Sequence, residues 1–439
     1  MQKKIIALAV AGLVSGAAFA QTNVTIYGVA DGSFEMTKGS GGNGGAIVAG
    51  AQTVNSFASK NRVAANASLI GFRGSEDLGQ GLKAVFQFEN ELDITSGNNA
   101  VGGAAGNVRP NGLGNRDTFV GLAGGFGTVA IGWLSSPHRS TGAKFDVMPG
   151  AAGAGGSLNI IGRVNTGSIY NGIGAAGTTA HTFGNTGTLA NNVGVIGRHS
   201  AIAYISPKFS GLNGVLAFVP GENEDNTATA ATRPSRNPSA WNLALHYDMG
   251  PLSVSYSFLN IKDFGTGQTA ATMTALDLSG AEKHKAQLLA ARYVFGDTTA
   301  SFMWDTVKSN LADGAAAGIT GDVTNKRNAW YLGLAHKMGA NNVSFAYAKA
   351  GDNSVGLGSR AVVGINNNTG SGAKMLSLRY GYDFSKRTQA YGQYSKISNG
   401  NNASYDFGVT STNLQGAGNG AVFAGADPQI INFGIRHTF

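Results

Sequence analysis

The sequence predicts an all-β protein, a transmembrane antiparallel β-barrel of sixteen strands, with eighteen strands as the alternative. Three observations lead to this prediction. Apolar and polar residues alternate along many short segments, and tight turns alternate with long loops between those segments. After residue 21, no apolar run approaches the length of about 18 residues that a membrane-spanning helix needs. A barrel of this kind is a single domain, so we expect one domain over residues 21–439.

The clearest alternation lies in residues 68–91, SLIGFRGSEDLGQGLKAVFQFENE, which read as a hairpin. In its second arm one face carries Leu82, Ala84, Phe86 and Phe88, and the other carries Lys83, Val85, Gln87, Glu89 and Glu91. A soluble protein would cover the apolar face with a second layer. In a membrane barrel, lipid covers that face and the polar face lines a water-filled lumen.

Composition narrows the class of protein. The 439 residues include 67 Gly, 9 Pro and no Cys, and only 13% of them are charged. This polarity is typical neither of a helical membrane protein nor of a disordered chain. A chain without cysteine has no disulfide framework and no thiolate chemistry.

The N-terminus predicts export. Lys3 and Lys4 precede a short apolar run, and small residues at Ala18 and Ala20 come just before Gln21. This order is typical of a secretory signal peptide. We therefore expect residues 1–20 to be removed by cleavage between Ala20 and Gln21, and the fold to begin after them.

The remaining chain divides into strand-like segments joined alternately by tight turns, such as residues 249–251, and long loops, such as residues 260–284. Short turns on one side and long loops on the other are typical of outer-membrane barrels. The expected strands are residues 23–35, the two arms of 68–91, 116–122, 127–133, 198–205, 211–219, 241–248, 252–258, 287–295, 299–307, 330–338, 343–348, 376–384, 388–395 and 429–439.

The last expected strand argues for a closed barrel. Its apolar face carries Ile431, Phe433, Ile435, His437 and Phe439. An open strand edge in lipid would leave backbone groups without hydrogen bonds, so the last strand has to pair with the first.

Residues 134–197 break the pattern. This segment is rich in Gly, Ala, Asn and Thr and shows neither helical nor strand periodicity. A loop of this length is uncommon and is usually functional or disordered.

Six segments, taken together and in order, resemble the trimeric general porins of Gram-negative bacteria, specifically the neisserial and β-proteobacterial porin family. The segments are residues 24–31 (VTIYGVAD), 71–89, 119–122 with 125–129, 204–211 (YISPKFSG), 380–388 (YGYDFSKRT) and 434–439 (GIRHTF). The resemblance implies a sixteen-stranded barrel, a homotrimer, and a long third loop folded into the lumen. It also implies a C-terminal signal for the barrel-assembly machinery, to which we assign Phe433, Ile435 and Phe439.

By the same resemblance, residues 134–197 are the constriction loop. Its charged pore-lining candidates are Arg139, Lys144 and Asp146. The opposite wall would carry Arg73, Lys83, Glu89, Arg116 and Arg198. Bases outnumber acids in both sets, so we expect weak anion selectivity, because fixed positive charge concentrates anions in a narrow cleft. The chain departs from the family at Leu69, Trp133 and Ile205, where each change removes a charge near the expected constriction.

The expected function is passive diffusion of ions and small hydrophilic solutes across the outer membrane, with lipid and lipopolysaccharide around the barrel. The alternatives are an outer-membrane barrel enzyme such as a protease or lipase, a plugged structural barrel, and a soluble β-sandwich adhesin. The sequence lacks a nucleophile motif and histidine pairs at metal-ligand spacing, so we expect no enzymatic activity, metal or cofactor.

We also expect no binding of nucleic acid. The positive charge of the chain is spread out, whereas nucleic-acid binding needs a concentrated patch. The acidic residues 222–225 could hold a divalent cation, although solvated loop charge is the simpler interpretation.

Overall fold

The computed structural model describes the chain in thirteen stretches: residues 23–40, 57–92, 94–95, 114–148, 154–163, 197–220, 239–262, 283–311, 323–356, 369–401, 403, 405–407 and 425–439. The expected signal peptide, with its cleavage position between Ala20 and Gln21, lies outside these ranges, and so does the acidic cluster at residues 222–225. Within the described ranges, no helix is both long and apolar enough to cross a membrane.

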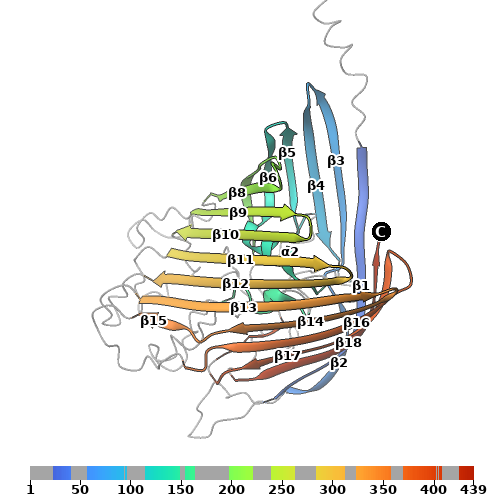
Figure 1. Ribbon diagram of the computed structural model, residues 1–439, viewed down its shortest axis with the longest axis vertical. Helices are drawn as coiled ribbons and strands as arrows, with labels where there is room; N and C mark the ends of the chain where they lie inside the picture. Colours follow the sequence, from blue (N-terminus) through green and yellow to red (C-terminus); the bar gives the residue numbers. More distant parts are fainter. Residues whose placement is uncertain are drawn as a thin grey trace, which may run out of the picture.

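Eighteen strand segments form one continuous antiparallel sheet (Figure 1). They are β1 (Asn23–Ser40), β2 (Phe57–Ala65), β3 (Leu69–Gly79), β4 (Leu82–Glu91), β5 (Thr118–Gly124), β6 (Gly127–Ser135), β7 (Arg198–Ile205), β8 (Leu212–Val219), β9 (Ser239–Met249), β10 (Leu252–Lys262), β11 (Lys283–Phe295), β12 (Thr298–Leu311), β13 (Val323–Met338), β14 (Asn341–Ala350), β15 (Ser354–Gly356), β16 (Ala373–Asp383), β17 (Thr388–Asn399) and β18 (Asp427–Thr438).

These segments occupy sixteen positions around the barrel, because two positions hold two segments each. β2 and β3 pair with successive halves of β1, and β14 and β15 pair with successive parts of β13. The predicted count of sixteen strands is confirmed. β2 was missed from the sequence, and β1 continues to Ser40, five residues beyond the expected end.

β18 pairs with β1 and closes the sheet. The register runs from Val29 opposite Thr438 to Ser40 opposite Asp427. Beyond that ladder, Gly28 and Phe439 exchange both backbone hydrogen bonds, at 3.0 and 3.1 Å. The predicted pairing of the last strand with the first is confirmed.

Side chains alternate between the two faces of the wall. In β11, Leu288 is fully buried whereas Leu289 is 48% exposed. In β18 the apolar face predicted from the sequence is exposed as well, with Phe433 at 56% and Ile435 at 59%. We call this apolar side the outer face and the side of Leu288 the inner face. Lipid would cover an apolar outer face in a membrane barrel.

The two ends of the barrel differ. Tight turns at residues 250–251, 296–297, 339–340 and 384–387 lie at one end, which we call the turn rim. The connections that leave the other end, the loop rim, are long and include residues 263–282, 312–322 and 357–372. Barrels of the bacterial outer membrane place short turns in the periplasm and long loops outside the cell.

The contact between Gly28 and Phe439 gives a first prediction. A Cβ at residue 28 would meet the Phe439 ring and would lie 2.6 Å from the backbone oxygen of Leu69. We expect Gly28→Ala to lower the free energy of unfolding of the barrel by about 1–3 kcal/mol, which is the usual cost of overpacking. The folded fraction after refolding in detergent, measured by heat-modifiable electrophoretic mobility, should fall. Gly125→Ala is the control, since nothing lies within 4 Å of a Cβ there; equal folded fractions for both variants would contradict the prediction.

Candidate pore constriction

The connection from β6 to β7 is the third one at the loop rim, and it contains a helix that sequence periodicity did not reveal. Helix α2 (Pro137–Phe145) follows β6 directly, and the short helix η1 (Ser157–Asn159) comes later in the same connection. The Ser136 side chain caps α2 by accepting a hydrogen bond from the backbone N–H of Arg139 at 3.1 Å. Pro137 occupies the first turn, where a missing N–H costs nothing. Local capping therefore starts this helix without an amphipathic repeat.

The described part of this connection packs against the inner face of the barrel. Phe145, Ile160 and Ile161 are fully buried and belong to one apolar cluster with wall residues such as Leu288 and Tyr331. α2 contacts β8 to β12 and η1, and it is seen behind β10 and β11 in Figure 1. The segment is therefore supported by one side of the wall.

A buried carboxylate joins the beginning and the end of this segment to the wall. Asp305 of β12 forms an ion pair with Arg327 of β13 at 2.7 Å. His138 Nε2 of α2 lies 3.3 Å from Asp305 Oδ1, and all three side chains have no exposed surface. The backbone N–H of Gly162 also donates to Asp305, at 2.9 Å. The Asp305 carboxylate thus contacts His138, near the beginning of the connection, and Gly162, near the end of its described part.

Asp146 joins the two described pieces of the connection to each other. Its carboxylate accepts hydrogen bonds from the backbone N–H groups of Met148 and Ser157 at 2.9 and 2.6 Å, and from the Tyr331 hydroxyl at 2.8 Å. Burial raises the pKa of Asp146 to about 6, although these hydrogen bonds act in the opposite direction. Asp146 is therefore engaged in holding the segment on β13.

Lys144 is held against the wall near the turn rim. Its ammonium lies 3.1 Å from Asp248 of β9, and the guanidinium of Arg292 donates to the Lys144 carbonyl at 3.2 Å. The charge of Lys144 is thus matched by a carboxylate, and Lys144 fixes the C-terminal end of α2.

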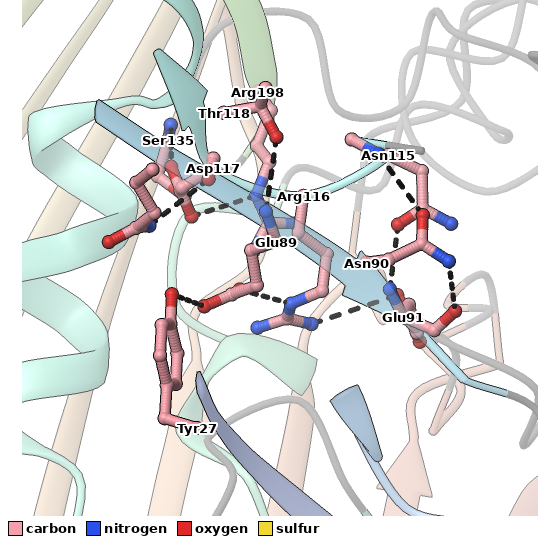
Figure 2. Close-up of polar contacts among 12 residues, drawn as sticks. Tyr27, Glu89, Asn90, Glu91, Asn115, Arg116, Asp117, Thr118, Ser135 and Arg198 are labelled. Carbon is pink, nitrogen blue, oxygen red and sulfur yellow. Dashed lines mark hydrogen bonds and ion pairs between the residues drawn. The ribbon is translucent and has the colours of Figure 1, made fainter. Parts of the chain in front are cut away.

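A second cluster of charges lies on the wall formed by β4, β5 and the strands beside them (Figure 2). Arg116 forms an ion pair with Glu89 and lies 3.7 Å from Glu91. The other Glu89 oxygen accepts a hydrogen bond from the hydroxyl of Tyr27 on β1, at 3.2 Å. Two carboxylates that share the inner face of β4 are therefore bridged by one arginine.

Asp117 forms the other half of this cluster. Its carboxylate accepts from the Ser135 hydroxyl at 2.9 Å and forms an ion pair with Arg198 at 3.0 Å (Figure 2). Burial alone would raise the pKa of Asp117, but Arg198 and the Ser135 hydrogen bonds outweigh it and hold that pKa below its usual value. Asp117 links the start of β5 to the end of β6 and the start of β7.

Two further arginines border the cluster. Burial and the nearby charges of Arg198 and Arg116 lower the pKa of Arg139 to about 9, so Arg139 remains charged at neutral pH. The guanidinium of Arg73 lies over the Tyr27 ring, 5.1 Å from its centroid. Arginines from the wall and from α2 thus meet around Glu89 and Asp117.

The structure sorts the residues predicted from the sequence into two groups. Glu89 and Arg116 are in direct contact, and the residues Arg73, Arg139 and Arg198 lie around them. The other three predicted residues lie elsewhere. Lys83 is next to the β3–β4 turn, Lys144 holds the connection to β9, and Asp146 holds it to β13.

Several members of these sites were not identified from the sequence. Asp117 directly follows Arg116, and the alternation along β5 would have placed it on the inner face. Tyr27 lies in a strand whose faces the sequence did not distinguish. The contact of His138 with Asp305 and Arg327 has no sequence signal, because these residues come from three distant segments.

Comparisons with known proteins were made for both sequence and structure. A family model described as Gram-negative porin matches residues 7–402. Outer membrane porin protein 32 of Delftia acidovorans is 29% identical over 444 residues, which span all of both chains. Major outer membrane protein P.IB of Neisseria gonorrhoeae is 28% identical over 277 residues, which cover 61% of this chain and 59% of that protein.

Among solved structures, an anion-selective porin from Comamonas acidovorans has a TM-score of 0.63 at 23% identity, covering 95% of this chain and all of the other. The trimer form of OmpT from Vibrio cholerae has a TM-score of 0.54 at 13% identity, covering 95% of this chain and 99% of the other. At these identities the likeness is one of fold.

The Asp305 contacts predict how the connection is held. Asp305→Asn should destabilise the barrel by about 3–5 kcal/mol, because it leaves the Arg327 guanidinium buried without a counter-charge. We also expect noisier single-channel current as the connection loosens. The control is Asp297→Asn, in an exposed turn at the turn rim. The double variant Asp305→Asn/Arg327→Met should be less destabilised than Asp305→Asn alone; a double variant that is worse than the single would show that the ion pair is not the cause.

The raised pKa of Asp146 predicts a pH dependence. In the folded chain this carboxyl holds its proton up to a pH of about 6, whereas its unperturbed pKa is 3.8. Its contribution to stability is therefore complete below pH 3.8 and is lost as the pH rises through about 6. Thermal unfolding of the wild type should lose about 1–3 kcal/mol between pH 4 and 7 relative to Asp146→Asn. Parallel pH profiles for the two proteins would refute this prediction.

Proposed function

Because this chain belongs to the Gram-negative porin family, we propose that its barrel is a water-filled outer-membrane channel. Ions and small hydrophilic solutes would diffuse through it passively, and no reaction is catalysed. The sixteen-stranded wall, apolar outside and polar inside, supplies the path.

We propose that the channel favours anions weakly. The observation that carries this proposal is that most described carboxylates on the inner face already form ion pairs with bases, whereas Glu89 and Glu91 share Arg116. The ion pairs are Glu35–Arg62, Glu89–Arg116, Asp117–Arg198, Asp31–Arg436, Asp248–Lys144 and Asp305–Arg327.

Other inner-face arginines have neutral partners. Arg73 lies over the Tyr27 ring, Arg292 donates to a backbone carbonyl, and Arg379 donates to Gln389 and Gln393. The inner face of the described wall therefore carries excess positive charge, which concentrates anions in a low-dielectric channel. The structural relative described as an anion-selective porin supports this sign.

The constriction is proposed to lie between the connection at residues 134–197 and the wall of β1 to β7. The described part of that connection lies on the wall of β8 to β16, for example where Asn159 meets Met375. Arg163 of the same connection meets the Asp406 carbonyl in the connection that follows β17. Its charged border would be Arg73, Glu89, Arg116, Arg139 and Arg198. Lys83 lines the lumen nearer the turn rim, and Lys144 and Asp146 position the connection.

The remaining proposals concern export and assembly. Residues 1–20 act as a signal peptide that is cleaved between Ala20 and Gln21. Phe433, Ile435 and Phe439, which are 56%, 59% and 45% exposed on the outer face, present the C-terminal signal to the barrel-assembly machinery. The assembled state is a homotrimer surrounded by outer-membrane lipid and lipopolysaccharide, in keeping with the trimer form of a protein of the same fold.

The proposed selectivity predicts the sign of a reversal potential. In a planar bilayer across a KCl gradient, the wild type should give large conductance steps and an anion-directed potential. Arg73→Glu should lower the anion-to-cation permeability ratio severalfold, because it reverses an unneutralised charge beside Glu89. Arg387→Glu, which makes the same charge change in an exposed turn, is the control. A cation-directed wild-type potential would overturn the proposed selectivity, and the absence of conductance from a folded barrel would overturn the channel.

A further inference from the structure

A cavity of about 240 Å³ lies on the inner face of the wall near the turn rim, on strands that do not border the proposed constriction. The inner-face residues that line it include Thr299, Ala335, Asn342, Ser344, Arg379 and Gln389. Val147, from the connection between β6 and β7, lines it as well. A single water needs about 10–15 Å³ of such volume, so the cavity has room for a small organic solute.

Small side chains leave this hollow in the wall. The strand register places Thr299, Ala335 and Ser344 directly opposite one another on β12, β13 and β14. Arg379 is the next residue in the same row, opposite Ser344 on β16. Three strand spacings separate Thr299 from Arg379, or roughly 14 Å between their backbones. The row therefore offers two hydroxyls and one guanidinium along a line, with no bulky side chain between them.

Val147 fixes one side of the cavity. Its backbone N–H donates to the Tyr331 hydroxyl at 3.1 Å. Its side chain lies over Gly333 of β13, since a Cβ at that glycine would come within 2.9 Å of Val147 Cγ1. The valine is thus seated on the wall and presents an apolar surface to the cavity. A solute in the cavity would lie between the connection and the wall.

Arg379 is the buried charge of this cavity. It is 8% exposed, and its guanidinium lies 3.6 Å from the centre of the Tyr391 ring. Its N–H groups donate to the side-chain oxygens of Gln389 and Gln393, at 3.0 and 3.2 Å. The Gln389 amide N–H in turn donates to Asp383 at 2.8 Å, which orients the Gln389 oxygen towards Arg379. The guanidinium is therefore held in one position before any ligand arrives.

The charge of Arg379 is not matched by an ion pair. Among the residues that the structure describes, no carboxylate lies within ion-pair distance of its guanidinium. Asp31, which accepts a hydrogen bond from the Tyr391 hydroxyl, forms its ion pair with Arg436 instead. A guanidinium has five N–H donors in one plane, so the two glutamines do not use them all. This geometry suits a carboxylate, which an arginine can bind at two points.

Two other charged residues line the cavity at its turn-rim end. Asp297 and Lys337 are both exposed, and the Lys337 ammonium lies 3.6 Å from Asp383. Solvent and salt screen exposed charges more than buried ones. The buried guanidinium of Arg379 therefore decides the charge of a ligand, and one buried base suits one negative charge.

The remaining polar groups of the cavity suit hydroxyls. Thr299 and Ser344 carry hydroxyls and Asn342 carries an amide, so each can both donate and accept a hydrogen bond. The hydroxyls of a sugar have the same property. The apolar side chain of Val147 would lie against the C–H groups of such a molecule. A ligand that matches the cavity thus has one carboxylate at one end and several hydroxyls along its length.

We propose that this cavity binds a hydroxylated monocarboxylate such as a six-carbon sugar acid. Its carboxylate accepts hydrogen bonds from Arg379, and its hydroxyls bond to Thr299 and Ser344. The site rests on the proposed function, because a solute reaches it through the lumen. A channel with a weak general preference for anions would then have a separate, saturable site for one class of anion.

The test measures binding of D-gluconate to the purified protein in detergent by saturation-transfer NMR. Three ligands separate the contacts, since gluconate carries both the carboxylate and the hydroxyls, sorbitol carries only the hydroxyls, and butyrate carries only the carboxylate. We expect saturable binding of gluconate that is at least tenfold tighter than binding of sorbitol or butyrate.

Variants of the protein test the location of the site. Arg379→Gln should weaken gluconate binding at least tenfold, because it removes the buried charge. The matched control is Arg387→Gln, which removes the same charge from an exposed turn and should bind normally. Ser344→Leu fills the hollow and leaves Arg379 in place, and it should lose binding as well. Heat-modifiable electrophoretic mobility identifies the variants that are folded.

Four outcomes would overturn the proposal. Sorbitol that binds as tightly as gluconate would show that the carboxylate is not recognised, and butyrate that does so would show the same for the hydroxyls. Normal binding by the folded variants would place the ligand elsewhere. An equal loss in Arg379→Gln and Arg387→Gln would make the effect one of net charge.

Single-channel conductance in KCl, recorded for the same preparations, separates this site from the channel function. A protein that conducts but does not bind gluconate would refute the site and leave the channel. A folded protein that binds gluconate but does not conduct would refute the channel and leave the site.

Discussion

Closure of the sheet is the constraint on which the rest of this structure depends. In hydrocarbon, an unpaired backbone N–H or C=O costs several kcal/mol, so a spanning sheet cannot have a free edge. The chain meets this constraint by pairing β18 with β1 over twelve positions and by ending on the Gly28–Phe439 contact. A closed sheet has an inner and an outer face. The residues of each strand therefore alternate between the face towards the lumen and the face towards lipid.

Apolar packing alone does not fix the position of the connection from β6 to β7. Phe145, Ile160 and Ile161 give the connection an apolar contact with one side of the wall, but such contact is non-directional. Position is set by polar groups that are removed from water, chiefly Asp305 with Arg327. In a low dielectric these interactions are strong when complete and costly when broken. These contacts fix the described part of the connection to the wall of β8 to β13.

The parts of this fold that could be predicted are those that repeat along the chain. Alternation identified the strands, the outer face of β18 and the inner position of Glu89, because the period of a strand is a local property. The helix α2 could not be found in this way, since it depends on the Ser136 cap and on contacts with distant strands. Asp305 and Arg327 could not be paired with His138 either, because the register between strands and the path of a loop are tertiary properties. β2 was missed because Gly-, Ala- and Asn-rich sequence around it has little hydrophobic contrast.

The inner face of the wall carries arginines at the positions described above, and the loop-rim part of the outer face carries lysines. This difference follows from what each side chain contacts. Inside, Arg116, Arg198 and Arg379 make several directional hydrogen bonds to carboxylates or amides of the wall, which suits a planar guanidinium. Their charges are thereby held in place on the inner face. Outside, the described loop-rim ends of β10 to β14 carry lysines, whose flexible stems adapt to a fluid layer. The same sheet thus carries arginines on its inner face and lysines on its outer face, because successive residues point in opposite directions.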